Sequence, residues 1–173
     1  MKRRFYAPLL VASLALLGAS RQETLLLQQL HAINQAELQA GQLAEQRGQL
    51  QDVRNFGRML VDDHTRAEQQ LAAVAKADGV DLAPAKPGPG VLFVQQELDR
   101  SADKIKKAST ANFDYTFAEE MRTGHREAIQ MVRSAQTTFQ QSPAVERLLS
   151  DLLPQLQRHE NMADTILARG VAH

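Results

Sequence analysis

The sequence predicts an all-α protein built as a bundle of four long helices. Hydrophobic residues recur at spacings of three and four along four separate stretches, which is the period of one helix face. The composition is rich in Gln, Ala, Leu, Glu and Arg, residues that favour helices. No stretch alternates hydrophobic and polar residues in the manner of a half-buried strand.

The first two helices are expected over residues 23–47 and 50–77, separated by a short turn. Gly48 ends the first helix and Gly79 the second, since glycine is common just after the last turn of a helix. The hydrophobic face of the first helix contains Leu26, Leu30, Ile33, Glu37, Gly41 and Ala44, and that of the second contains Val53, Phe56, Leu60, His64, Ala67, Leu71 and Val74.

A proline-rich segment, residues 83–90, separates this pair from the rest of the chain. Prolines and glycines at this density exclude a helix or an inner strand there. A shorter helix is expected over residues 92–107, so the whole connection spans residues 79–111.

Two further long helices follow. The third is expected over residues 112–140, and the fourth begins at Ser142-Pro143, with Ser as the N-cap and Pro in the first helical position, and ends at Gly170. Two helical hairpins joined by one long crossover have the connectivity of ferritin-like four-helix bundles. We expect a single domain of this kind over residues 21–173. The hydrophobic face of the third helix contains Phe113, Phe117, Met121, His125, Ala128, Val132, Ala135 and Phe139. That of the fourth contains Val145, Leu149, Leu152, Leu156, His159, Ala163 and Ile166.

The N-terminus has the order of a secretory signal peptide. Three basic residues at positions 2–4 precede an apolar stretch over residues 7–19 that is too short to span a bilayer comfortably. Small residues Gly18 and Ser20 favour cleavage after Ser20, and cleavage after Ala19 is the other candidate. We therefore expect residues 1–20 to be removed and the protein to reside in the periplasm or cell envelope. The alternative is an uncleaved N-terminal anchor.

Composition excludes several classes of protein. The chain has 20 basic and 20 acidic residues, so no basic excess indicates nucleic-acid binding. It contains no cysteine, which excludes a cysteine-based zinc site and a lipid anchor on an N-terminal cysteine. No stretch of the expected mature chain, residues 21–173, predicts a transmembrane span.

Each hydrophobic face is interrupted by a polar residue: Glu37, His64, His125 and His159 on the four helices in turn, with Asp63 beside His64. The first four lie within about three residues of their helix midpoints, or roughly 5 Å at the rise of a helix, so they share one layer. A buried charge must be paired, neutralised or bound to metal. One hypothesis is a site for one divalent transition metal such as zinc, copper or iron. The other is a closed Glu–His hydrogen-bond network that sets the helix register.

Four segments of the sequence form a recognisable set: Asn34-x-x-Glu37, residues 53–65 ending in Asp63-His64-Thr65, Asn112-Phe113-Asp114-x-x-Phe117, and Leu153-Pro154-x-Leu156-x-x-His159. Together they resemble an exported, ferritin-like bacterial family catalogued as domain of unknown function 4142, whose members are often labelled outer membrane proteins. The resemblance covers about residues 25–169 and implies a bundle in the envelope without a settled activity. Phe117 stands where the family often has Tyr, and the cysteine of its lipoprotein members is missing.

The ligand pattern argues against a di-iron centre. Di-iron bundles carry Glu-x-x-His on two helices, but Val61 and Leu156 stand three residues before His64 and His159. Our leading hypothesis is a non-catalytic envelope protein involved in metal binding or stress. The alternative is a mononuclear redox or hydrolytic enzyme that uses the same layer. Under either hypothesis, the expected partners are a metal ion, another envelope protein or a second copy of the chain.

Overall fold

The computed structural model describes residues 19–170, and the predicted signal peptide lies almost wholly outside this range. The described residues form helices and no strand, which confirms the all-α prediction. The elements are α1 (Arg21–Arg47), α2 (Gln51–Asp78), α3 (Pro89–Lys107), the short 3-10 helix η1 (Thr110–Asn112), α4 (Phe113–Thr138) and α5 (Pro143–Gly170).

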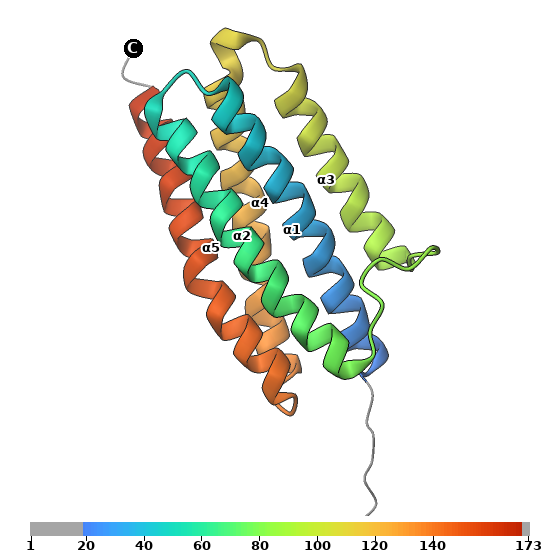
Figure 1. The fold of residues 1–173 in the computed structure, drawn as a ribbon. Helices are drawn as coiled ribbons and strands as arrows, with labels where there is room; N and C mark the ends of the chain where they lie inside the picture. Colours follow the sequence, from blue (N-terminus) through green and yellow to red (C-terminus); the bar gives the residue numbers. More distant parts are fainter. Residues whose placement is uncertain (1–18, 171–173) are drawn as a thin grey trace, which may run out of the picture.

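Four of the helices form the bundle, and α3 lies outside it (Figure 1). α1 packs along α2, α4 packs along α5, and α2 joins the two hairpins through its contact with α5. α1 and α4 contact each other only slightly, and α3 lies along α1 on this side of the bundle. The crossover therefore covers the least closed seam of the bundle.

Polar side chains hold the helix ends in place. Ser20 caps α1: its hydroxyl accepts a hydrogen bond from the Glu23 N–H, and the Glu23 carboxylate accepts one from the Ser20 N–H. The first residues of α2 lack such a cap of their own. Instead the carboxylate of Asp114 accepts from the N–H groups of Gln49 and Leu50, at 2.9 and 2.7 Å. This contact fixes the start of α2 against α4.

Two glycines allow α1 and α2 to approach closely. A Cβ atom added to Gly41 would lie 2.7 Å from the carbonyl oxygen of Gly57, and one added to Gly57 would lie 2.6 Å from the carbonyl oxygen of Gly41. Each glycine thus leaves room for the backbone of the other helix. This crossing holds the two helices together about one turn from the polar residue Glu37 and less than two turns from Asp63.

The hydrophobic core is divided into two clusters. One contains Leu27, Leu71, Val132 and Leu149, and the other contains Phe56, Leu60, Phe117 and Ile166, among other residues. The polar residues between them along each helix are themselves buried, as the sequence predicts for a polar layer at mid-bundle. They are Asn34, Glu37, Asp63, His64, His125 and His159.

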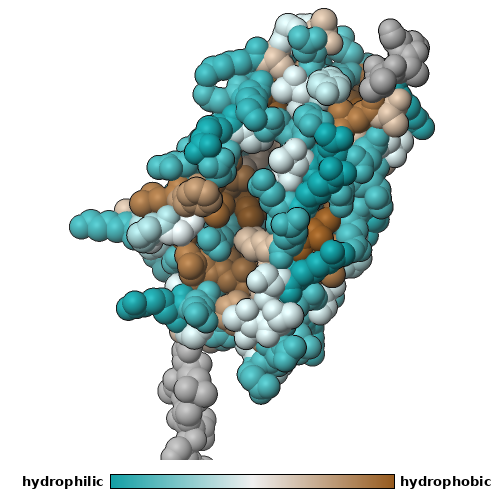
Figure 2. Space-filling view, turned by 180° about the vertical axis from the view of Figure 1, so that it is seen from behind, coloured by the Kyte–Doolittle hydropathy of each residue, from teal (hydrophilic) through white to brown (hydrophobic). Residues whose placement is uncertain are grey.

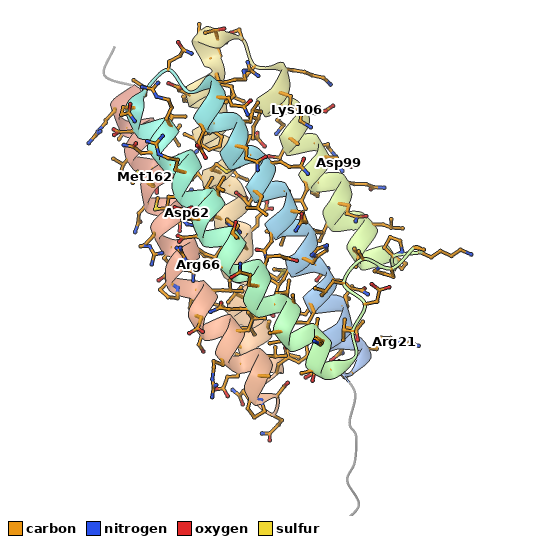
Figure 3. The ribbon with its side chains drawn as sticks, in the orientation of Figure 1. Arg21, Asp62, Arg66, Asp99, Lys106 and Met162 are labelled. Carbon is orange, nitrogen blue, oxygen red and sulfur yellow. The ribbon has the colours of Figure 1, made fainter. Side chains whose placement is uncertain are left out.

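Charged side chains cover the outer faces of the helices. Asp62 and Arg66 project from α2, and Asp99 and Lys106 from α3 (Figure 3). None of the described helices is both long enough and apolar enough to cross a bilayer.

The glycine crossing gives a first prediction. Gly57→Ala should lower the free energy of unfolding by about 1–3 kcal/mol, because the new methyl group clashes with the backbone of α1. Urea denaturation measures the change. Gly124→Ala in α4 is the matched control: its added Cβ would meet nothing closer than 4.0 Å, so the greater helix propensity of alanine should stabilise the protein. Equal stability of wild type and Gly57→Ala would contradict the tight crossing.

Candidate metal centre

Three buried histidines from three helices meet at mid-bundle. His64 of α2 is 4% exposed, and His125 of α4 and His159 of α5 are 1% exposed. One ring nitrogen from each lies within 4.8 Å of the other two. The rings of His125 and His159 are 5.0 Å apart between centroids, and those of His64 and His159 are 5.4 Å apart. Helical periodicity faces these residues inward, and the packing of the helices brings them together.

One ring nitrogen of each histidine makes a hydrogen bond with an oxygen atom of a neighbouring residue. Nδ1 of His125 donates to the carbonyl oxygen of Met121, at 2.7 Å. Nδ1 of His64 lies 3.0 Å from Oδ1 of Asn34, and Nε2 of His159 lies 2.9 Å from Oδ2 of Asp63. Because an amide or carboxylate oxygen only accepts, the ring nitrogen must carry the proton in each pair.

The hydrogen bonds of Asn34 fix its orientation. Its Nδ2 donates to Oε2 of Glu68, at 3.0 Å, so its Oδ1 faces His64 as an acceptor. Oε1 of Glu68 in turn lies 2.6 Å from Nδ1 of His31, which is only partly buried. A chain of polar contacts therefore connects the outer side of α1 with the histidine cluster.

These partners assign the tautomers and leave three lone pairs. A neutral imidazole has one N–H, so the second ring nitrogen of each histidine is unprotonated: Nε2 of His64, Nε2 of His125 and Nδ1 of His159. Nε2 of His64 contacts no hydrogen-bonding group among the described residues. Nε2 of His125 and Nδ1 of His159 face each other at 3.0 Å, and with both rings neutral no proton lies between them. A cation satisfies this arrangement.

Burial favours the neutral rings. It lowers the pKa of His64 well below its ordinary value, and the positive charges of His159 and His125 in their protonated forms lower it further. Burial, followed by the effect of His125, lowers the pKa of His159 to about 4, although Asp63 opposes the shift. At neutral pH both rings are therefore able to ligate a metal.

Asp63 is an ionised partner of the cluster. Burial by itself would raise its pKa, but the hydrogen bonds and charges of His159 and Arg158 outweigh this effect and lower the pKa below its ordinary value. Arg158 donates to Oδ2 of Asp63 at 3.1 Å, and Arg66 forms an ion pair with Oδ1. A carboxylate behind a ligating histidine orients the ring and increases its basicity.

Glu37 approaches the cluster from α1. It is 7% exposed, and its Oε2 has no hydrogen-bond partner among residues 19–170. Burial raises the pKa of this carboxyl group, and the charge of protonated His125 opposes the shift. Glu37 is thus a buried acid with a free oxygen atom beside the histidines.

A pocket of about 210 Å³ leads to these residues. Glu37, His64 and His125 line it, together with residues of α3 and α4. Figure 2 shows the molecule from behind, where hydrophobic surface gathers in a hollow surrounded by hydrophilic side chains. His159 does not line the pocket, so the cluster is accessible from the side of α1, α3 and α4.

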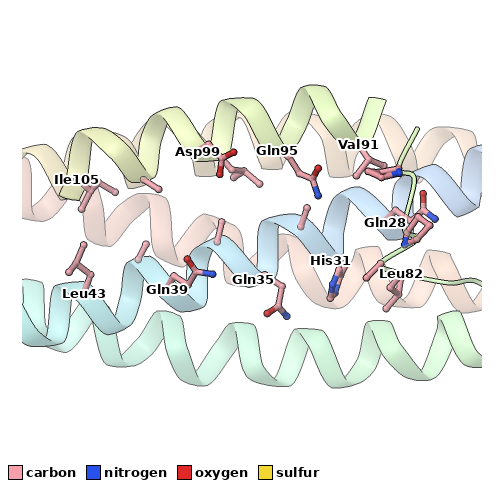
Figure 4. A pocket seen from close by; sticks show the side chains of 18 of the residues that line it. Gln28, His31, Gln35, Gln39, Leu43, Leu82, Val91, Gln95, Asp99 and Ile105 are labelled. Carbon is pink, nitrogen blue, oxygen red and sulfur yellow. The ribbon is translucent and has the colours of Figure 1, made fainter. Parts of the chain in front are cut away.

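A second, larger pocket of about 490 Å³ lies between α1 and α3 (Figure 4). Amide side chains of Gln28, Gln35, Gln39 and Gln95 line it, and so does His31. His31 links it to His64 through Glu68 and Asn34. It contains no cluster of metal-ligating side chains among the described residues.

The structure places the five residues suggested by the sequence in different positions. It brings His64, His125 and His159 together, puts Asp63 behind His159, and puts Glu37 in the wall of the pocket. Asn34 was missed as a partner of His64, although its place three residues before Glu37 on a hydrophobic face was a signal. The Met121 carbonyl group could not be predicted from the sequence as the partner of His125, because every residue has a backbone carbonyl group.

The donor set suits particular metals. Imidazole nitrogen binds zinc, copper, iron and nickel, whereas magnesium and calcium prefer oxygen ligands. Three protein ligands with an accessible fourth position also describe many catalytic zinc sites. The cluster therefore fits one transition-metal ion, and Glu37 is an additional oxygen donor nearby.

Burial of neutral histidines gives a second prediction, for metal-free protein. Because the pKa of His159 is lower in the folded than in the unfolded chain, stability should be complete above about pH 6.5 and decrease as the pH falls towards 4. One such histidine accounts for roughly 3 kcal/mol at the acid end. Urea denaturation across this range measures the loss. The loss should be smaller in His159→Gln than in the wild type; equal losses in the two proteins would contradict the assignment.

Comparison with known proteins places the chain in a family. A search of curated proteins found no match, and neither did a search of solved structures. A family model does match residues 12–166, which include all the histidines of the cluster and confirm the resemblance seen in the sequence. The chain therefore belongs to the family described as domain of unknown function (DUF4142).

Proposed function

We propose that this protein binds one divalent transition-metal ion through His64, His125 and His159, as a non-catalytic protein of the bacterial periplasm. Two observations carry the proposal: one ring nitrogen from each of the three histidines lies within 4.8 Å of the other two, and the unprotonated Nε2 of His125 and Nδ1 of His159 face each other at 3.0 Å. Each ring is oriented by a separate oxygen acceptor: Asn34, the Met121 carbonyl group or Asp63. Such partners behind the ligands are typical of metal sites.

The competing hypothesis of a purely structural hydrogen-bond network explains the cluster less well. A closed network gives every buried donor and acceptor a partner. Here the tautomers leave His125 and His159 with lone pairs facing each other, and Oε2 of Glu37 and Nε2 of His64 have no partner among residues 19–170. A metal ion held by the three histidines would use the free nitrogen of each ring, whereas a proton shared by His125 and His159 satisfies only that pair.

A mononuclear enzyme is the second candidate function. The pocket favours it, because a catalytic metal keeps a position open for water or substrate. In this candidate Glu37 would be the acid or base, since it lies on the pocket side with a free oxygen atom. Turnover of a substrate by the metal-loaded protein, abolished by Glu37→Gln without loss of metal, would favour the enzyme.

The metal hypothesis gives a third prediction. Protein purified without a His-tag and dialysed against Zn²⁺ should retain about one ion per chain, measured by elemental analysis. His64→Ala should abolish this binding, because it removes one of the three histidines that cluster among the described residues. Asp63→Asn should weaken binding by about 10–100-fold, as is common for a partner behind a ligand.

The control separates metal binding from folding. His31→Ala removes a histidine outside the cluster and should retain the metal. Zn²⁺ should raise the melting temperature of the wild type but not that of His64→Ala, because only a ligand of the folded state stabilises it. Equal destabilisation by His64→Ala with and without Zn²⁺ would instead support the structural network.

Location in the periplasm gives a fourth prediction. The signal-peptide order of residues 1–20 predicts a mature chain that begins at Ser20 or Arg21. The capping interactions of Ser20 with Glu23 are retained only by the first of these cuts, which therefore gives the more stable α1. Intact-mass analysis of periplasmic material identifies the terminus. A mass that includes Met1 would contradict cleavage.

A further inference from the structure

The pocket beside the histidine cluster has the size and lining of a small-molecule site. Its volume is about 210 Å³. An apolar cavity of roughly 150 Å³ is enough to hold one benzene molecule, so there is room for a molecule of one or two rings. The apolar part of its wall comes from Ile33 of α1, Phe93, Val94 and Leu98 of α3, and Ala128 and Met131 of α4.

Two polar residues of the pocket wall have a buried atom without a hydrogen-bond partner. Glu37 and His64 line the pocket, and both are more than nine-tenths buried. Oε2 of Glu37 and Nε2 of His64 have no hydrogen-bond partner among the described residues. An apolar wall that leads to a few converging polar atoms is the usual form of a ligand site.

Gly124 also lines the pocket, and packing does not require a glycine there. Gly41 and Gly57 are needed because a side chain would strike the opposite backbone at 2.7 or 2.6 Å. A Cβ at Gly124 would meet only Oε1 of Glu37, at 4.0 Å. Glycine inside a helix is less stable than alanine, so its presence here carries a cost that no close contact explains. What it provides is open space over Glu37, next to His125.

We propose that a small uncharged molecule with a flat apolar body and one ligating nitrogen or oxygen atom enters this pocket and binds the metal ion, and that Gly124 keeps the entrance open. The inference rests on the proposed metal site. The pocket lies on the side of His64 and His125, where His159 and its partner Asp63 do not block access. Glu37, Glu97 and Glu127 all line it, and their carboxylates, where ionised, would repel an anion. The positive charge of the metal ion would repel a cation, so an uncharged ligand is favoured.

The test uses the full mature chain loaded with Co²⁺, whose visible absorption spectrum changes when a ligand of the metal is exchanged. Metal content is measured first, by elemental analysis. Imidazole and benzimidazole are then added separately. Both present one ligating nitrogen, but only benzimidazole has a second ring to bury. Benzimidazole should bind at least ten times more tightly, because the pocket removes the extra apolar surface from water.

Variants at neighbouring positions locate the entrance. Gly124→Leu should retain Co²⁺ and weaken benzimidazole binding by about tenfold or more, since the new side chain occupies apolar pocket space. Thr123→Leu, an exposed position of α4 outside the pocket, is the matched control and should bind benzimidazole like the wild type.

Each outcome decides the proposal. Equal affinity of the wild type for the two probes, or equal affinity of Gly124→Leu and Thr123→Leu for benzimidazole, would overturn it while leaving the metal site intact. Absence of Co²⁺ from the wild type would overturn the proposed metal function and this inference together, and it is recognised before any probe is added.

Discussion

Burial of three imidazole rings in one layer is the constraint on which the structure depends. Each ring has two nitrogen atoms, and a polar group taken out of water without a partner costs on the order of 1–3 kcal/mol. The fold meets this demand for one nitrogen of each ring, through Asn34, the Met121 carbonyl group and Asp63. Of the other nitrogens, Nε2 of His125 and Nδ1 of His159 face each other, and Nε2 of His64 has no hydrogen-bond partner among the described residues, so the layer is not a closed hydrogen-bond network.

The rest of the bundle is arranged around this layer. Apolar clusters on either side exclude water from it, and Phe56 packs near the rings of His125 and His159. The close crossing of α1 and α2 at Gly41 and Gly57 holds the helices that carry Asn34, Glu37 and Asp63. Asp63 in turn needs Arg66 and Arg158, since a buried carboxylate is stable only when it is paired. The charge of Asp63 is thus stabilised by arginines farther out from the layer.

The crossover helix α3 connects this layer with the surface. Of its residues only Val91 and Ile105 are buried, and Leu92 and Phe93 remain exposed, so it is a cover rather than a member of the core. It lies along α1, and both pockets are lined by residues of these two helices. An ion pair between Lys104 and Glu120 joins α3 to α4. The smaller pocket reaches the histidines directly, and the larger one reaches them through the hydrogen bonds of His31, Glu68 and Asn34.

The sequence by itself determined the helices, the crossover and the polar layer. A periodicity of 3.6 residues shows which side chains share a face, and His64, His125 and His159 stand out because every neighbour on that face is apolar. Only the tertiary structure decided the roles within the layer: Asp63 behind His159, Glu37 in the pocket wall, and Asn34 and the Met121 carbonyl group as partners of the rings. Periodicity fixes the direction of a side chain from its own helix axis. The rotation and separation of the four axes, which decide the contacts a few ångströms apart, follow from packing between residues distant in the chain.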